Sequence, residues 1–198
     1  MSRLHDLNII STNGKSAELF EELFPKILEN NYSSPSSFIK KNWAVYKNDP
    51  TGNSNVNGAI FEYLLASIFY LEGIKPIFFQ AQVVFVPNVN FDFLCYSKEF
   101  GPIVFSAKTS LRERYKQADL EAMALKNVHR KSKSYLITLN ETEANSVNKK
   151  IASGDVIGID EVIVASSFNF DELLRSMKEY SFIKPEKVDI ITALRTIE

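Results

Sequence analysis

The sequence has few of the features that mark secreted or membrane proteins. Its single cysteine, Cys95, cannot form a disulfide within the chain, which excludes a disulfide-stapled domain. No apolar run reaches the roughly 18 residues that a membrane-spanning helix needs. The first residues lack the apolar segment ending in small residues that is typical of a signal peptide. These absences predict a cytoplasmic protein with no membrane partner.

A strong charge of one sign is also absent, because 23 Lys and Arg nearly balance 24 Asp and Glu. Proteins that coat nucleic acid through bulk charge rely on many unneutralised cations, so this class is excluded. The charge is nevertheless uneven along the chain. Between positions 108 and 133, three acids accompany eight basic residues: Lys108, Arg112, Arg114, Lys116, Lys126, Arg130, Lys131 and Lys133. Such a local basic segment suits a DNA enzyme with an acidic metal site.

A length of 198 residues, without repeats or low-complexity tracts, suits a single domain. We expect a helical N-terminal portion over about 1–50 and a catalytic core over about 55–170. Apolar periodicity predicts a helix over 16–30 that Pro25 divides, and a second helix over about 38–46. The apolar run from Gly58 predicts a buried helix that Gly73 ends.

The rest of the chain alternates between extended and helical patterns. Segments rich in β-branched and aromatic residues predict strands, and apolar periodicity predicts helices between them. The predicted strands are 76–86, 90–97, 102–110, 134–140 and 158–166, and the predicted helices are about 116–128, 142–152 and 171–180. This order predicts an α/β domain with a central mixed sheet flanked by helices.

Two strand residues and two helix residues form a candidate site. Asp92 and Lys108 lie in consecutive predicted strands, and strand alternation points Ser106 to the same side as Lys108. If these strands are neighbours, Asp92 and Lys108 meet where the sheet ends. Glu62 and Glu121, on the flanking predicted helices, would bring the number of carboxylates to three.

This set suits phosphodiester hydrolysis. Mg²⁺ binds through one or two carboxylates and substrate phosphate oxygens, and it lowers the pKa of a bound water. Asp92 and Glu121 would be metal ligands, Glu62 a second-metal or water-bridged ligand, and Lys108 the group that positions the water. Taken singly, each residue has an ordinary explanation as a solvated or strand-end side chain. Together they favour a metal site, because Asp92 and Glu62 are flanked by apolar residues, where carboxylates need partners.

The segments GAIFE, FDF, FSAKTSLRER and LEA, in this order, resemble the PD-(D/E)XK nucleases over about residues 57–140. Ser106 stands in the acidic position two residues before the lysine. This departure is similar to restriction enzymes that cut CCGG-type and CCWGG-type sites, in which a glutamate of the next helix supplies the carboxylate. The resemblance assigns that role to Glu121. The proline of the family name is absent, and Phe91 occupies its place.

The resemblance also implies how DNA would be recognised. In those enzymes an Arg-acid-Arg element after the lysine strand contacts G·C pairs, and Arg112, Glu113 and Arg114 follow Lys108 here. The same tripeptide also suits a solvated helix start. Tyr115 and Lys116 are candidates for contacts to DNA phosphates, as are Lys126, Arg130 and Lys133.

The function implied by the resemblance is that of a sequence-specific type II restriction endonuclease. It would cut double-stranded DNA with Mg²⁺ as a homodimer, with a tetramer as the other expected assembly. A repair or structure-specific nuclease of the same fold and an inactive relative that binds DNA or a partner protein remain the alternatives.

Overall fold

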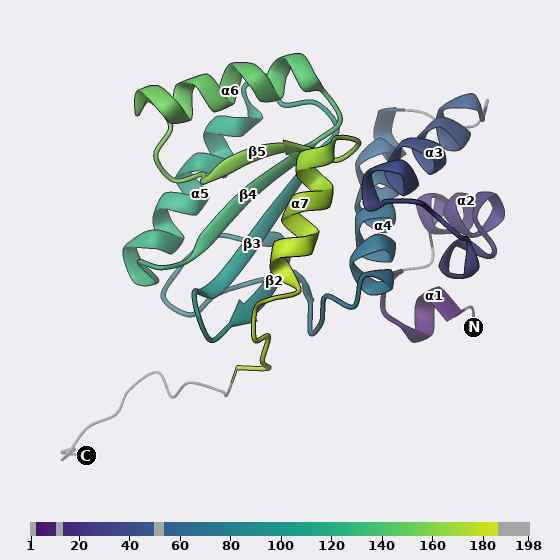
Figure 1. Ribbon diagram of the computed structural model, residues 1–198, viewed down its shortest axis with the longest axis horizontal. Helices are drawn as coiled ribbons and strands as arrows, with labels where there is room; N and C mark the ends of the chain where they lie inside the picture. Colours follow the sequence, from purple (N-terminus) through teal and green to yellow (C-terminus); the bar gives the residue numbers. More distant parts are fainter. Residues whose placement is uncertain (1–2, 11–13, 50–53, 186–198) are drawn as a thin grey trace.

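The computed structural model describes residues 3–10, 14–49 and 54–185, and it has the α/β architecture that the sequence predicts (Figure 1). The strands are β1 (Phe78–Ala81), β2 (Phe91–Ser97), β3 (Gly101–Lys108), β4 (Lys133–Thr138) and β5 (Glu161–Val164). The helices are α1 (Arg3–Asp6), α2 (Lys15–Leu23), the 3₁₀ helix η1 (Ile27–Glu29), α3 (Pro35–Asn48), α4 (Ser54–Leu71), α5 (Arg114–Val128), α6 (Glu141–Ser153) and α7 (Phe168–Met177). None of the described helices is long and apolar enough to span a membrane.

The five strands form one mixed sheet in the order β1-β2-β3-β4-β5. The first three strands pair antiparallel, and β3, β4 and β5 run parallel. The carboxyl ends of β3, β4 and β5 therefore lie at the same end of the sheet as the first residue of β2. We call this the Lys108 end of the sheet, and it is the end at which the predicted site residues of β2 and β3 should meet.

Helices cover the sheet on both faces, as Figure 1 shows. On one face, α5 and α6 pack together over β4 and β5 through a cluster that includes Ala118, Val147 and Leu136. On the other face, Phe69 of α4 contacts the rings of Phe93 and Phe105 at centroid distances of 5.5 and 5.3 Å, and α7 joins the same cluster. The predicted helix-sheet-helix layering is confirmed.

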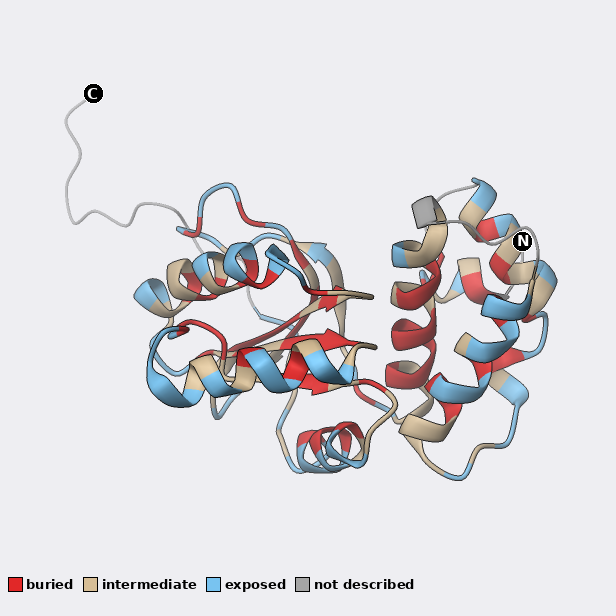
Figure 2. Ribbon diagram, turned by 90° about the horizontal axis from the view of Figure 1, so that it is seen from above, coloured by how far each residue is buried: buried red, intermediate tan, exposed pale blue. Residues whose placement is uncertain are grey.

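The N-terminal helices pack against α4 instead of the sheet (Figure 2). Pro25 separates α2 from η1, as expected, and the Ser34 hydroxyl caps the first turn of α3 by accepting from the Ser37 amide. Asp171 of α7 accepts hydrogen bonds from the amide and hydroxyl of Ser36 at 2.6 and 2.7 Å, which joins α3 to α7. One continuous core extends from the N-terminal helices to the sheet.

The predicted strand over 76–86 is wrong in its second half, since β1 ends at Ala81. Phe85, beyond the end of β1, has a φ angle of 66°, which is outside the extended conformation. Val86 and Val89 are nevertheless buried, because the loop packs them against the face of β2 and β3. The apolar pattern that suggested a strand therefore belongs to a loop in which Val86 is buried while Val84 and Phe85 are exposed.

The loop before β5 lies unusually close to α5. A Cβ atom added to Gly158 would lie 2.3 Å from the Asp119 carbonyl oxygen and 2.7 Å from the Met123 amide nitrogen. The Asp119 carboxylate accepts from the amides of Gly158 and Ile159 at 2.6 and 3.2 Å. This contact fixes the position of the middle of α5, where Glu121 lies.

Candidate active site

Strands β2 and β3 separate at the Lys108 end of the sheet. Their pairing runs from Ser97 and Gly101 to Phe93 and Phe105 and then stops. Beyond that point β3 stays paired with β4 as far as Lys108, while β2 stays paired with β1. The backbone amide of Ala107 therefore donates to a side chain of β2 and not to a backbone carbonyl of β2.

That side chain is Asp92, whose carboxylate fills the gap between the two strands. Its Oδ2 atom accepts from the Ala107 amide at 2.8 Å and from the Lys108 ammonium at 2.9 Å. The hydroxyl of Ser106 and the side-chain amide of Gln80 each lie 3.5 Å from an Asp92 oxygen. The side chains of Asp92 and Lys108 are only 12% and 24% exposed. The structure therefore brings Asp92, Lys108 and Ser106 together as the sequence predicted.

Glu62 approaches this pair from α4. Burial, followed by the negative charge of Asp92, raises the pKa of the Glu62 carboxyl to about 7, and Lys108 lowers it in part. Among the described residues, none hydrogen-bonds to this half-buried carboxyl. Two carboxyl groups thus lie near one ammonium group. A divalent cation would satisfy the remaining negative charge, and oxygen ligands of this kind suit Mg²⁺.

Glu121 borders a small cavity and makes no hydrogen bond or ion pair with Asp92 or Lys108. It lines the cavity together with Ser106, and its carboxylate accepts from Gln117 of its own helix at 2.8 Å. No cluster of three or more His, Cys, Asp or Glu side chains that could hold a metal occurs within 3–10, 14–49 and 54–185. Of the three carboxyl groups expected to converge, those of Glu62 and Asp92 lie near each other. The Glu121 carboxylate instead contacts Gln117 of its own helix.

Ser134 of β4 also lines this cavity, and sequence reasoning missed it. Its side chain is buried, and its hydroxyl lacks a hydrogen-bond partner in the described part of the chain. A buried hydroxyl without a partner is costly and usually faces a water or a ligand. No sequence signal distinguishes Ser134 from any other strand serine.

The predicted DNA-contacting residues fall into two groups. Arg112, Glu113 and Arg114 are exposed at the Lys108 end. Lys116 is exposed in the first turn of α5, where it pairs with Glu113 and lowers the pKa of that carboxyl. Tyr115, the other predicted contact, differs from these residues in being buried. It is 7% exposed in the core between α5 and α6, and its hydroxyl accepts from Lys150 at 2.6 Å.

Two of the further phosphate candidates are engaged elsewhere. Lys126 and Lys133 lie 2.9 and 3.5 Å from carboxylate oxygens of Asp160, where β4 and β5 begin. This is the opposite end of the sheet from Lys108. Arg130 is exposed in the turn before β4.

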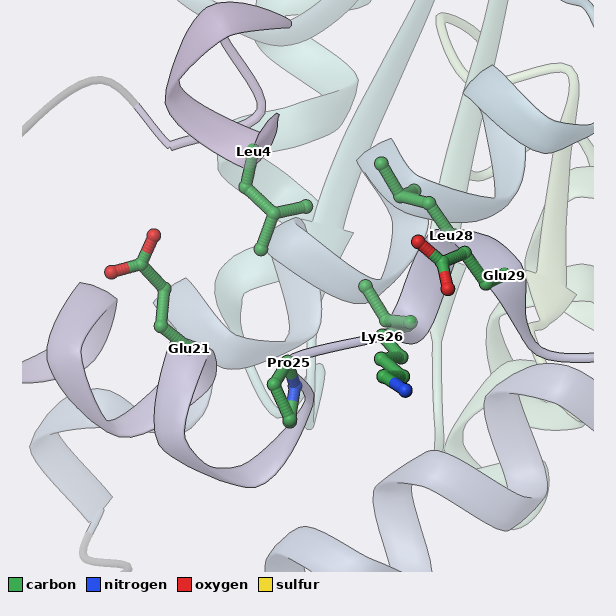
Figure 3. A pocket seen from close by; sticks show the side chains of 7 residues that line it. Leu4, Glu21, Pro25, Lys26, Leu28 and Glu29 are labelled. Carbon is green, nitrogen blue, oxygen red and sulfur yellow. The ribbon is translucent and has the colours of Figure 1, made fainter. Parts of the chain in front are cut away.

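A larger cavity of about 220 Å³ lies among the N-terminal helices (Figure 3). Leu4, Pro25, Ile27 and Leu28 supply its apolar lining, and charged residues stand at its margin. Its lining includes no residue of the sheet. Size alone therefore does not identify the candidate site, which is defined by the charged groups at the Lys108 end.

No family model, curated protein or solved structure matches this chain. Similarity therefore assigns neither a family nor an activity. The functional argument depends on the residues and geometry described above.

Proposed function

We propose that the protein is a Mg²⁺-dependent nuclease of the PD-(D/E)XK kind that cuts double-stranded DNA as a sequence-specific type II restriction endonuclease. The observation that carries this proposal is the Asp92–Lys108 pair at the point where β2 and β3 separate, with Glu62 beside it. The four segments that carry the resemblance, GAIFE, FDF, FSAKTSLRER and LEA, fall in α4, in β2, in β3 with the loop after it, and in α5.

The carboxylates would supply the metal ligands. Asp92 and Glu62 lie near the same ammonium group, and Glu121 would join them by leaving Gln117 and changing its side-chain rotamer. When bound there, Mg²⁺ would acidify a water and stabilise negative charge on the phosphate.

The protein's own groups would position the reactants. The Ala107 amide fixes the Asp92 carboxylate, which in turn holds the Lys108 ammonium. Lys108 would orient the attacking water and add positive charge near the developing oxyanion. Its partial burial strengthens both effects, because charges interact more strongly away from bulk water.

DNA recognition and assembly complete the proposal. The exposed Arg112, Glu113 and Arg114 lie just beyond Lys108, where they would contact base edges of a duplex bound at this end of the sheet. Two subunits related by a two-fold axis would present one site to each strand of a palindromic target. Each DNA strand would then be cut at the active site of a different subunit.

The deciding experiment digests mixed plasmid and phage DNA with purified protein and Mg²⁺ and sequences the fragment ends. Discrete fragments with a shared end motif are expected. Cutting confined to branched or damaged DNA would instead identify a repair or structure-specific nuclease, and binding without cutting would identify an inactive relative.

Calcium provides a second test. Ca²⁺ occupies oxygen sites with looser geometry than Mg²⁺. It should therefore support DNA binding in a mobility-shift assay without cleavage. Efficient cutting in Ca²⁺ alone would contradict the proposed mechanism.

A further inference from the structure

The loop that links Lys108 to α5, residues 109–113, contains a strained backbone. Arg112 has a φ angle of 42°, in the left-handed region that residues other than glycine rarely adopt. Such conformations are costly and persist only where surrounding contacts hold them. The Arg112 side chain itself is exposed. The contacts that hold the backbone must therefore come from elsewhere in the loop or from a neighbouring element.

The principal contact comes from Glu143 in the first turn of α6. Its carboxylate accepts from the Leu111 amide at 2.6 Å, and the Arg112 amide and Ser110 hydroxyl each lie 3.4 Å from it. The Glu143 amide in turn donates to Asn140 at 3.0 Å. The carboxylate is thus anchored to a capped helix on one side and to the loop on the other.

Two other contacts complete the fixation of the loop. The Leu111 side chain is fully buried in the core between α5 and α6. An Arg114 guanidinium nitrogen donates to the Ser110 carbonyl at 2.6 Å, which closes the loop onto the first turn of α5. The backbone around Arg112 is therefore fixed on both sides while its side chain extends into solvent.

We infer that Glu143 is a positioning residue for DNA readout, because it holds the strained loop that presents Arg112 beside Lys108. This inference rests on the proposed function. A bidentate contact between arginine and guanine depends on direction, and a displacement of about 1 Å can cost a hundredfold in rate. Glu143 would accordingly control which sequence is cut, without touching DNA or the scissile phosphate.

Asp119 provides a matched control within the same molecule. It too is a helix carboxylate that accepts from two successive loop amides, those of Gly158 and Ile159, at 2.6 and 3.2 Å. Its loop lies before β5, at the end of the sheet opposite Lys108. Loss of this contact should lower stability as loss of Glu143 does, without affecting readout.

The first experiment compares the fragment ends produced by wild type, Glu143→Ala, Arg112→Ala and Asp119→Ala. The Glu143→Ala protein should still cut but should discriminate against single-mismatch sites on the order of tenfold less than wild type. Glu143→Gln, which keeps one acceptor oxygen, should recover part of this discrimination. The Asp119→Ala protein should keep the wild-type end motif whatever its cutting rate, because Asp119 contacts the loop before β5 and not the Arg112 loop.

A double mutant separates positioning from a general loss of stability. If Glu143 acts through Arg112, the double variant Arg112→Ala, Glu143→Ala should be no less selective than Arg112→Ala alone. Additive losses would overturn the inference. The inference would also be overturned if Glu143→Ala kept full selectivity while Arg112→Ala lost part of it. Either result would leave the proposed nuclease function intact.

Limited proteolysis tests the positioning without any nuclease activity. Trypsin cleaves after arginine, and Arg112 and Arg114 are exposed. Cleavage within the loop should be at least about tenfold faster in Glu143→Ala than in wild type or Asp119→Ala, since a released loop fits a protease more readily. Equal rates in the three proteins would overturn the inference. Failure of wild type to cut DNA would instead count against the proposed function.

Discussion

The two ends of the sheet carry aspartate–lysine pairs of nearly identical geometry. Asp92 accepts from a strand amide at 2.8 Å and from Lys108 at 2.9 Å. At the opposite end, Asp160 accepts from the Ser134 amide at 2.8 Å and pairs with Lys126 at 2.9 Å. Their third charged partner differs, because Asp160 has a second lysine whereas Asp92 has Glu62 beside it.

This difference reverses the charge balance of the two pairs. Two ammonium groups around Asp160 leave no demand for a cation, so that pair serves to join α5, β4 and β5. Two carboxyl groups around Lys108 leave negative charge that a metal ion would neutralise. An aspartate–lysine contact is thus insufficient to mark an active site, and the additional carboxylate is the informative feature.

The largest expected effect is a loss of DNA cleavage after substitutions in the Asp92–Lys108 pair but not in the Asp160–Lys126 pair. Asp92→Ala and Lys108→Ala should each reduce cleavage by at least about a thousandfold, since such groups stabilise charge in the transition state. Folding, seen by circular dichroism, and most DNA binding should remain. Asp160→Asn is the control and should cut at close to the wild-type rate. A near wild-type rate in either Asp92→Ala or Lys108→Ala would show that the active site lies elsewhere.

Glu121 should be as important as Asp92 if the carboxylate has moved from the strand to the helix. Glu121→Ala should then be as inactive as Asp92→Ala in the same plasmid-cutting assay. Because Ser106 lines the same cavity, the double change Ser106→Glu, Glu121→Ala should recover part of the activity. Gln117→Ala, which removes only the present partner of Glu121, should have little effect. Normal cleavage by Glu121→Ala would exclude Glu121 as a ligand but leave Asp92 and Lys108 in place.

The sequence predicted those parts of the molecule that depend on local pattern. The element order followed from periodicity, and the meeting of Asp92 with Lys108 followed from the pairing of consecutive strands. The burial of Tyr115 was not predictable, because it depends on Lys150 and the packing of α6, which lies far along the chain. The contact of Glu143 with the Arg112 loop was not predictable either, because it joins residues that are far apart in the sequence. The spacing of Asn140 and Glu143 indicates a helix start but does not reveal the partner of the Glu143 carboxylate.

A moderate effect on stability should distinguish Glu62 from an ordinary surface acid. Its pKa in the folded protein, about 7, lies above the ordinary value of 4.5, so the folded state binds the proton more tightly. Without metal, wild-type stability should therefore fall as the pH rises from about 4.5 through 7. Glu62→Gln lacks this titration.

Thermal unfolding in EDTA measures the difference. At pH 8, Glu62→Gln should be about 1–2 kcal/mol more stable than wild type, a figure reduced from the full shift because the carboxyl is partly exposed. Near pH 4 the two proteins should be equally stable. Glu22→Gln, at an exposed position of α2, is the control. Equal stability of Glu62→Gln and wild type at pH 8 would mean that the Glu62 carboxyl is well solvated.

The smallest effect belongs to the opposite end of the sheet. Lys126→Met should lower the free energy of unfolding by about 1 kcal/mol or less, because a partly exposed ion pair is weak and Lys133 still neutralises Asp160. Urea denaturation measures this change, and cleavage should be unaffected. A large loss of cleavage would show that the charges at the two ends are coupled.

The close approach at Gly158 limits which substitutions this protein tolerates. The constraint is steric, since any side chain there would meet the Asp119 carbonyl and the Met123 amide, which stand on either side of Glu121 in α5. Even alanine would push this part of the helix outward. In a library of all substitutions selected for DNA cutting, position 158 should therefore accept glycine alone, although Gly158 has no side chain that could bind metal or DNA.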